Sequence, residues 1–183
     1  MFLDKIVASD LLIPIAKDSD GNFVKPADAN KTASYFCPEC GECVILRRGT
    51  KKRSHFAHKT SQCSQESVVH KAAKEMIQMV VLAWKAGLRP APVFVCKCYR
   101  CHNKIESPIP DKVDAVALEV TLADGHRVDV GLLEKGITIA AIEVKVTHAV
   151  DVIKAGQISV PFIEVDGNEI IERPDRLVAI QDG

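Results

Sequence analysis

Two acidic residues and one lysine stand in apolar runs that are typical of β-strands, and their types and spacing could serve chemistry on a phosphate group. Asp129 stands between two valines, and Glu143 and Lys145 stand two residues apart in a later run. Two carboxylates on neighbouring strands repel each other unless a cation lies between them. Mg²⁺ uses one or two protein carboxylates and completes its shell with water and phosphate. With a lysine to stabilise the phosphate or help deprotonate a water, these residues could hydrolyse a phosphodiester with Mg²⁺ or Mn²⁺ held by Asp129 and Glu143.

Three strands, expected over residues 113–122, 126–133 and 137–147, would position these side chains. The loops between them end in glycine, so we expect a hairpin register that pairs Asp129 with Thr121 and with Ala141. Alternate and paired residues share a face. One face then carries Glu119, Thr121, Asp129, Glu143, Lys145 and Thr147, and the other carries Leu118, Val120, Val128, Val130, Ile142, Val144 and Val146. The apolar face is core, whereas the polar face fits either a metal site or a solvated outer surface.

A helix expected over residues 64–85 supplies further polar groups. Ser64 suits its N-cap, and an apolar stripe at helical spacing predicts the buried side. Glu66, His70 and Lys74 recur every four residues beside that stripe. Glu66 could be a third acid for the metal, with His70 and Lys74 near the phosphate. The alternative is an exposed helix face, which suits Lys74 better than Glu66.

A Cys-x-x-Cys pair, Cys37 and Cys40, has the spacing of a zinc knuckle, because both thiolates can reach one tetrahedral ion across a tight turn. The first choice of ligands is Cys37, Cys40, His58 and Cys63, with His55 in place of Cys63 as the alternative. Unliganded loop thiols remain the plain explanation. Four residues further along the chain could hold a second zinc ion, although ligands so close in sequence crowd the site. A zinc site and a set of unliganded residues are equally favoured for this group: Cys96, Cys98, Cys101 and His102.

Residues 47–53, between the first cysteines and His55, contain five basic residues and no acid. Such a loop could hold a nucleic-acid backbone through its phosphates without reading sequence, although most charge runs are simply solvated. The candidate nucleic-acid contacts are Arg47, Arg48, Lys51, Lys52, Arg53 and Lys59, together with His70 and Lys74 of the helix.

Composition narrows the class of protein. The 183 residues are 47% hydrophobic with a formal net charge of zero, so a folded core is expected and any nucleic-acid contact must be local. No apolar run approaches the ~20 residues of a membrane span. Acids within the first ten residues argue against a signal peptide, so we expect a cytoplasmic protein without membrane partners. Aromatic residues make up 5% of the chain, too few for a surface that mainly stacks bases.

Taken together, these motifs resemble the competence protein CoiA-like family, whose C-terminal part is a nuclease of the PD-(D/E)XK superfamily. The resemblance implies catalytic roles for Asp129, Glu143 and Lys145, and makes Glu66 the helix acid seen in some members. Val128 stands where the superfamily name has proline, a position that is often relaxed. The segments that carry the resemblance are residues 36–41, 54–59, 66–71, 127–130, 141–145, 147–151, Lys154 and residues 162–166.

The expected fold is α/β, with a restriction-endonuclease-like core of helix, three antiparallel strands, helix (residues 149–159) and strand (residues 161–165). A strand-rich zinc-binding module would occupy residues 1–63, and the nuclease-like domain, with a Cys-rich insertion near 96–102, residues 64–183. The expected activity is metal-dependent cleavage of nucleic acid, DNA favoured over RNA, in recombination, DNA uptake or defence. The chain could also form a homodimer. The alternative is a non-catalytic zinc-ribbon protein that binds DNA or assists recombination.

Overall fold

The computed structural model describes residues 12–49, 53–60, 63–98, 100–101, 103–147 and 158–182. The chain forms two compact units, residues 1–71 (unit 1) and 72–183 (unit 2). The sequence suggested a division after residue 63, whereas the structure divides inside α1 (Gln65–Lys85). The reason is that Val68, near the start of α1, is buried in the core of unit 1, while Ala73 and Ile77 are buried in the core of unit 2.

Unit 1 contains a five-stranded sheet of short strands in the order β2-β1-β3-β4-β5. Its core is centred on Phe56, whose side chain is fully buried and whose ring centroid lies 5.0 Å from that of Tyr35. Asp18 closes the first hairpin, where it accepts backbone hydrogen bonds from Asp20 and Asn22, as the turn-rich sequence predicts. The strands are β1 (Ala16–Lys17), β2 (Phe23–Val24), β3 (Tyr35–Phe36), β4 (Cys43–Arg47) and β5 (His55–His58).

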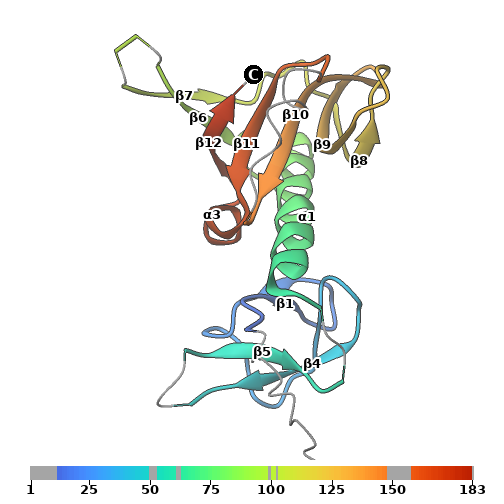
Figure 1. Ribbon diagram of the computed structural model, residues 1–183, viewed down its shortest axis with the longest axis vertical. Helices are drawn as coiled ribbons and strands as arrows, with labels where there is room; N and C mark the ends of the chain where they lie inside the picture. Colours follow the sequence, from blue (N-terminus) through green and yellow to red (C-terminus); the bar gives the residue numbers. More distant parts are fainter. Residues whose placement is uncertain are drawn as a thin grey trace, which may run out of the picture. The chain divides into compact units, whose positions relative to one another are not determined.

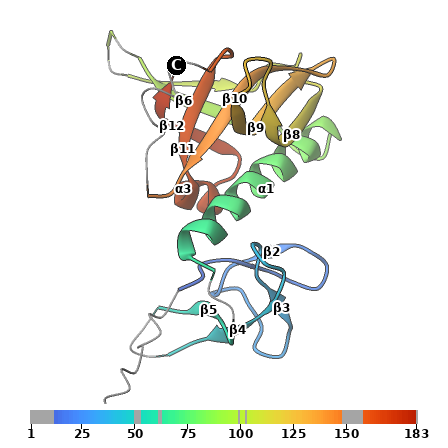
Figure 2. The same cartoon turned by 45° about the vertical axis from the view of Figure 1, so that its right-hand side comes forward.

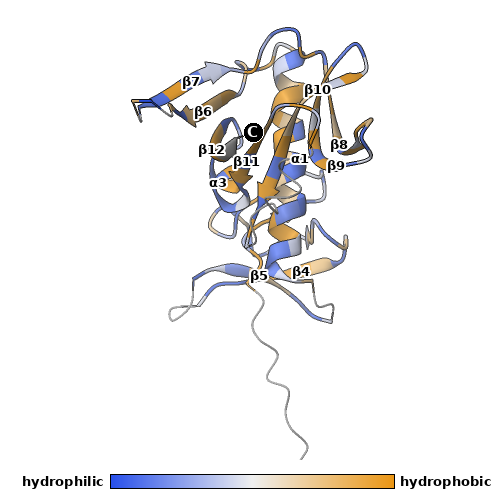
Figure 3. Cartoon of the chain, turned by 45° about the horizontal axis from the view of Figure 1, so that its top comes forward, coloured by the Kyte–Doolittle hydropathy of each residue, from blue (hydrophilic) through white to orange (hydrophobic). Residues whose placement is uncertain are grey.

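Helix α1 begins and ends where the sequence predicts. The Ser67 N–H donates to Ser64 Oγ at 2.9 Å, so Ser64 caps the helix. At the other end Gly87 takes a positive φ of 74° and its N–H bonds to the Trp84 carbonyl. Hydrophobic and hydrophilic stretches alternate along the helix (Figure 3). None of the helices formed by the described residues combines the length and the hydropathy that crossing a membrane requires.

Unit 2 is a seven-stranded sheet in the order β7-β6-β12-β11-β10-β9-β8. Helix α1 runs along one face of this sheet (Figure 1 and Figure 2), and its Ala73, Ile77 and Val81 share a core cluster with Val130 and Ile142. The elements are β6 (Val93–Lys97), β7 (Lys104–Pro108), β8 (Ala115–Thr121), β9 (Arg127–Glu134), β10 (Ile137–Lys145), β11 (Phe162–Asp166), α3 (Gly167–Glu172) and β12 (Arg176–Asp182). The antiparallel order β8, β9, β10 and the mixed α/β class are as expected.

The expected register of β9 is wrong by two residues on both sides. Thr121 pairs with Arg127, and Ala141 pairs with Gly131, so neither residue lies opposite Asp129. Because side chains alternate with a period of two, an even slip leaves each residue on its expected face. The polar face therefore keeps its membership, with Glu119 and Glu143, in place of Thr121 and Ala141, at the register positions nearest Asp129.

The β9–β10 hairpin explains how this register arises. Lys135 and Gly136 both have positive φ, 51° and 80°, and form a two-residue turn instead of the expected three-residue loop. That turn alone would align β10 one residue out of step, with Asp129 opposite the apolar Ile142. A bulge between Thr138 and Ala140 shifts the pairing by one, so Ile142 pairs with Val130. The bulge thus brings Glu143 to the level of Asp129.

Some parts of unit 2 were not anticipated. Strand β12 and helix α3 follow the last expected strand, and the described cysteines of the Cys-rich segment belong to the β6–β7 hairpin, which is part of the main sheet. The Asp166 side chain caps α3 by accepting from the N–H groups of Asn168 and Glu169. The helix expected at residues 149–159 lies almost entirely outside the described residues.

Candidate metal centre and candidate active site

Four side chains of unit 1 converge on one point. The ligand atoms of Cys37, Cys40, His58 and Cys63 all lie within 4.8 Å of one another. They are the four residues that sequence spacing gave as the first choice. Three thiols and one imidazole form a Cys₃His donor set, which is the set that binds a structural Zn²⁺ tetrahedrally. The group could therefore hold zinc.

The turn that presents Cys37 and Cys40 is built locally. The Cys37 N–H bonds to the Glu42 carbonyl at 2.8 Å, and the Gly41 N–H bonds back to the Cys37 carbonyl at 2.9 Å. Gly41 has a φ of 74°, a left-handed conformation that suits glycine. Lys71 of α1 donates to the Glu39 carbonyl at 3.0 Å and ties the turn to the helix.

Two thiols of the group, Cys37 and Cys63, hold their protons in the absence of metal. Burial raises the pKa of the Cys37 thiol above its ordinary value. Burial, together with the neighbouring thiols, raises the pKa of Cys63 to about 12. A metal that binds the group must therefore displace protons from these two thiols.

The alternative ligand His55 takes no part in this group. Its side chain is buried, and its Nδ1 lies 2.9 Å from the Arg53 carbonyl. Strand β5 explains the difference, because His55 and His58 are three residues apart and point to opposite faces of the strand. Cys63, which follows β5, supplies the fourth ligand.

The second cysteine group is not gathered in the same way. Cys96 lies within β6, and the Cys98 N–H bonds to the Asn103 carbonyl at the hairpin tip. Hydrogen bonds from the Cys101 and Arg100 backbone lower the pKa of the Cys98 thiol. Within the described residues the Cys37 group is the one cluster that brings three or more potential ligands together, and His102 lies outside those residues. The second zinc site stays a prediction.

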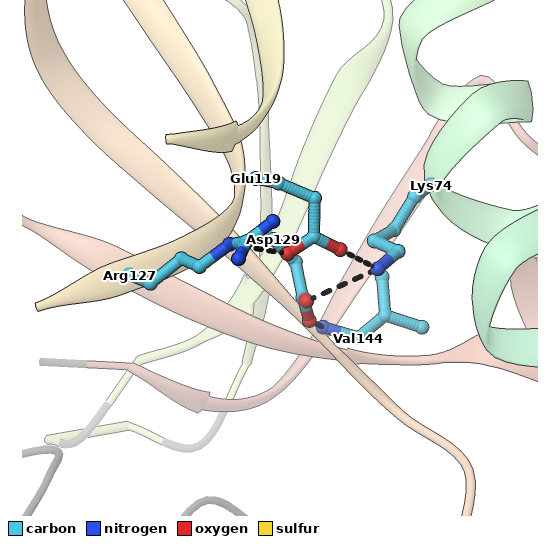
Figure 4. A network of polar contacts seen from close by, with 5 residues as sticks. All are labelled: Lys74, Glu119, Arg127, Asp129 and Val144. Carbon is cyan, nitrogen blue, oxygen red and sulfur yellow. Dashed lines mark hydrogen bonds and ion pairs between the residues drawn. The ribbon is translucent and has the colours of Figure 1, made fainter. Parts of the chain in front are cut away.

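A network of opposite charges surrounds Asp129 in unit 2 (Figure 4). The Lys74 ammonium of α1 contacts Glu119 Oε1 and lies 3.5 Å from Asp129 Oδ1. Asp129 Oδ2 accepts a hydrogen bond of 2.8 Å from the Val144 N–H. Arg127 Nε lies 2.9 Å from Glu119 Oε2. A cation does lie between two carboxylates here, but it is the side chain of a lysine.

Glu143 and Lys145 have a further acidic neighbour on β11. Glu143 and Glu164 pair in register between the parallel strands β10 and β11, and both are buried, 4% and 1% exposed. Glu143 therefore does not lie on a solvated outer surface, which was the alternative to a metal site for this face. Lys145, whose side chain is 28% exposed, places its Nζ 3.9 Å from Glu164 Oε1.

Two residues of this region were not among the sequence candidates. Glu119 was expected on the polar face without a role, and Glu164 stood in an apolar run that read as a plain buried strand. In the sequence, each of these residues is a carboxylate within an expected strand. Only the correct pairing register shows that each lies next to another carboxylate on the neighbouring strand.

The metal set expected from Asp129, Glu143 and Glu66 stays a prediction. Within the described residues these acids do not form a group of three potential ligands within reach of one ion. Asp129 and Glu143 lie on adjacent strands of unit 2, whereas Glu66 belongs to unit 1. Two carboxylates nevertheless suffice for Mg²⁺, which fills its remaining positions with water and substrate.

The predicted nucleic-acid contacts have different settings in the structure. Arg47, Arg53 and Lys59 are exposed on unit 1, and His70 is half-buried on α1. Arg48 instead donates to the backbone carbonyls of Pro26, Ala27 and Ala29, so its guanidinium anchors a loop. Lys74 is 7% exposed and ion-paired, so the alternative of an exposed helix face does not describe it, and its contact with nucleic acid stays a prediction. Lys51 and Lys52 lie outside the described residues.

These features define a mixed α/β protein with a Cys₃His centre and, in its larger unit, two carboxylates and a lysine on adjacent strands. Residues 23–66 match the family model described as Competence protein CoiA, N-terminal domain. The matched range includes all four residues of the Cys₃His group. It supports the resemblance to CoiA-like proteins for that part of the chain. No curated protein and no solved structure matches the chain.

Proposed function

We propose that this protein is a metal-dependent nuclease of the PD-(D/E)XK type that hydrolyses phosphodiester bonds, with DNA as the favoured substrate. The observation that carries the proposal is the contact between Asp129 and β10. Its carboxylate accepts a hydrogen bond from the Val144 N–H, and Val144 is the residue between Glu143 and Lys145. An acid on one strand thus reaches the Glu-x-Lys segment of the next.

The order of elements in unit 2 supports the same proposal. Helix α1 precedes the antiparallel strands β8, β9 and β10, and β11 then returns parallel to β10. This is the order that the resemblance implies for the nuclease core, apart from the segment at 148–157, which is not described. The match of residues 23–66 to the CoiA N-terminal domain suggests a role in competence, such as DNA uptake or recombination.

Each residue has a defined part in this proposal. Asp129 and Glu143 would hold Mg²⁺ or Mn²⁺, which when bound activates water and neutralises charge on the phosphate. Lys145 is partly exposed at the end of β10, where its ammonium can meet a phosphate oxygen. Glu164 holds that ammonium on the side of Glu143. In unit 1, zinc would fix the fold, and Arg47, Arg53 and Lys59 would contact the nucleic-acid backbone.

The test is cleavage of plasmid and single-stranded DNA by the purified full chain with Mg²⁺ or Mn²⁺. We expect Glu143→Ala and Lys145→Ala each to lower the rate at least about a hundredfold. Glu169→Gln, an exposed acid on α3, is the matched control and should cleave at the wild-type rate. Equal cleavage by wild type and both active-site variants would show that the activity belongs to a contaminant. RNA tested in parallel distinguishes the two substrate classes.

A second function is favoured by one specific observation. The Lys74 ammonium already neutralises part of the charge at Asp129, as a cation would in a site that binds no metal. The protein would then be a non-catalytic zinc-bearing DNA-binding or recombination accessory protein. Salt-dependent DNA binding that weakens in Arg53→Ala, with no cleavage under any metal condition, would establish this function.

A further inference from the structure

Lys74 is a charged residue in an unusually buried place. The exposed fraction is 7% for the whole residue and 9% for its side chain. The ammonium reaches Asp129 from α1 rather than from the sheet. Lysine is rarely buried to this degree unless its ammonium is paired. The pairing partners, Glu119 and Asp129, come from two neighbouring strands, so one ammonium links α1 to both β8 and β9.

Glu119, one of the two partners of Lys74, has an unusual backbone conformation. Its φ is 54°, a left-handed value that is uncommon for a non-glycine residue and costs free energy. The ladder between β8 and β9 passes over Glu119, since Leu118 pairs with Val130 and Val120 pairs with Val128. Its carboxylate contacts Lys74 through one oxygen and Arg127 through the other.

Asp129 is held from two directions as a result. Its Oδ2 is fixed by the Val144 N–H of β10, and its Oδ1 faces the Lys74 ammonium (Figure 4). We propose that Lys74, held by Glu119, is a positioning residue that keeps the Asp129 carboxylate turned toward the Glu143–Lys145 segment. The importance of this orientation for catalysis rests on the proposed function, whereas the orientation itself can be measured in the resting protein.

The charges of Lys74 and Glu119 give the proposal a diagnostic pair of effects on cation binding. Lys74→Met removes a positive charge beside Asp129, so Mn²⁺ should bind more tightly, by several-fold. Glu119→Gln removes a negative charge and leaves Lys74 to pair with Asp129 alone, so Mn²⁺ should bind more weakly. Both variants should nevertheless cleave DNA more slowly, by about tenfold or more, because Asp129 loses its fixed orientation. A loss of fold would weaken metal binding and cleavage in both variants together.

The direct readout is the amide hydrogen of Val144, measured by hydrogen exchange in NMR spectra of the full chain. If Lys74 positions Asp129, then in the metal-free protein Lys74→Met frees the carboxylate from the Val144 N–H, while a bound Mn²⁺ can still draw it back as a ligand, and the Val144 amide of the metal-free variant exchanges roughly tenfold faster. The amide of Ile142 in the same strand is the internal reference, because general loosening of β10 would move both. Lys85→Met, at the exposed C-terminal end of α1, is the matched control and should change neither amide.

Glu119→Gln is a second test should Lys74→Met fail to fold, since it weakens the hold on Lys74 without creating a cavity at a buried charge. Unchanged exchange at Val144 in the folded variants overturns the proposal, and so does a Mn²⁺ affinity that moves in the same direction in both. Faster exchange at Val144 in a protein that neither binds Mn²⁺ nor cleaves DNA supports the positioning contact and overturns the nuclease function.

Discussion

Zinc binding to the Cys37, Cys40, His58 and Cys63 group should be coupled to proton release and therefore to pH. Zinc binds thiolates, and the pKa of the Cys37 thiol is raised, while that of Cys63 is raised to about 12. Both thiols are protonated at pH 7, so each bound zinc must displace at least two protons. Every displaced proton makes the apparent affinity about tenfold higher per pH unit. From pH 7 to pH 8 we therefore expect the affinity to rise about a hundredfold or more.

The assay is titration of zinc-free protein with Zn²⁺ by calorimetry at fixed pH in two buffers of different ionisation enthalpy. The difference in heat gives the number of protons released, and competition with a chromophoric chelator gives the affinity at pH 7 and pH 8. Cys63→Ser should release one proton fewer and bind zinc more weakly. Cys43→Ser is the matched control, because Cys43 is exposed and lies outside the group. Zinc binding that releases no protons, or an affinity that is flat with pH, would refute the reasoning.

Three further predictions concern the sheet that carries the acidic site. Ile142 is fully buried, so Ile142→Ala should lower the free energy of unfolding of unit 2 by about 2–5 kcal/mol in urea denaturation. Ile137 is 69% exposed, so the control Ile137→Ala should change it by less than about 0.5 kcal/mol. Gly131→Ala should be destabilising by about 1–3 kcal/mol in the same assay, since an added Cβ would meet the Val120 side chain at 3.0 Å; equal stability would show that β8 yields at this point. Hydrogen bonds from Ser159 and His126 lower the pKa of Asp124 to about 2 in the folded state. The ionised carboxylate therefore stabilises the folded state fully at pH values above its unfolded pKa of about 4. This contribution is lost as the pH falls through 2. Acid unfolding curves of Asp124→Asn and wild type should therefore differ at pH 6 and converge near pH 2.

Features that depend on local spacing could be predicted from the sequence. The Cys-x-x-Cys turn and the His58 and Cys63 that follow it lie within one stretch of chain, so few arrangements bring four ligands together. The limits of α1 follow from Ser64 and Gly87, which act on neighbouring backbone groups. The faces of the strands follow from alternation alone, which survives an error of two residues in register.

Features that depend on distant pairing could not be predicted. The levels of Asp129 and Glu143 depend on a two-residue turn and on a bulge between Thr138 and Ala140, and neither has a distinctive sequence signal. The buried Lys74 is paired with Glu119, which lies forty-five positions away in the chain and has a left-handed backbone conformation. From helical spacing alone, Lys74 has the pattern of an exposed residue.

The location of a bound Mn²⁺ ion tests the central claim most directly. Crystals of the full chain soaked in Mn²⁺ would reveal the ion by its anomalous scattering. We predict a manganese peak between the carboxylates of Asp129 and Glu143, with the Lys145 ammonium facing the same space. Ordered Asp129 and Glu143 side chains with no manganese between them would contradict the account.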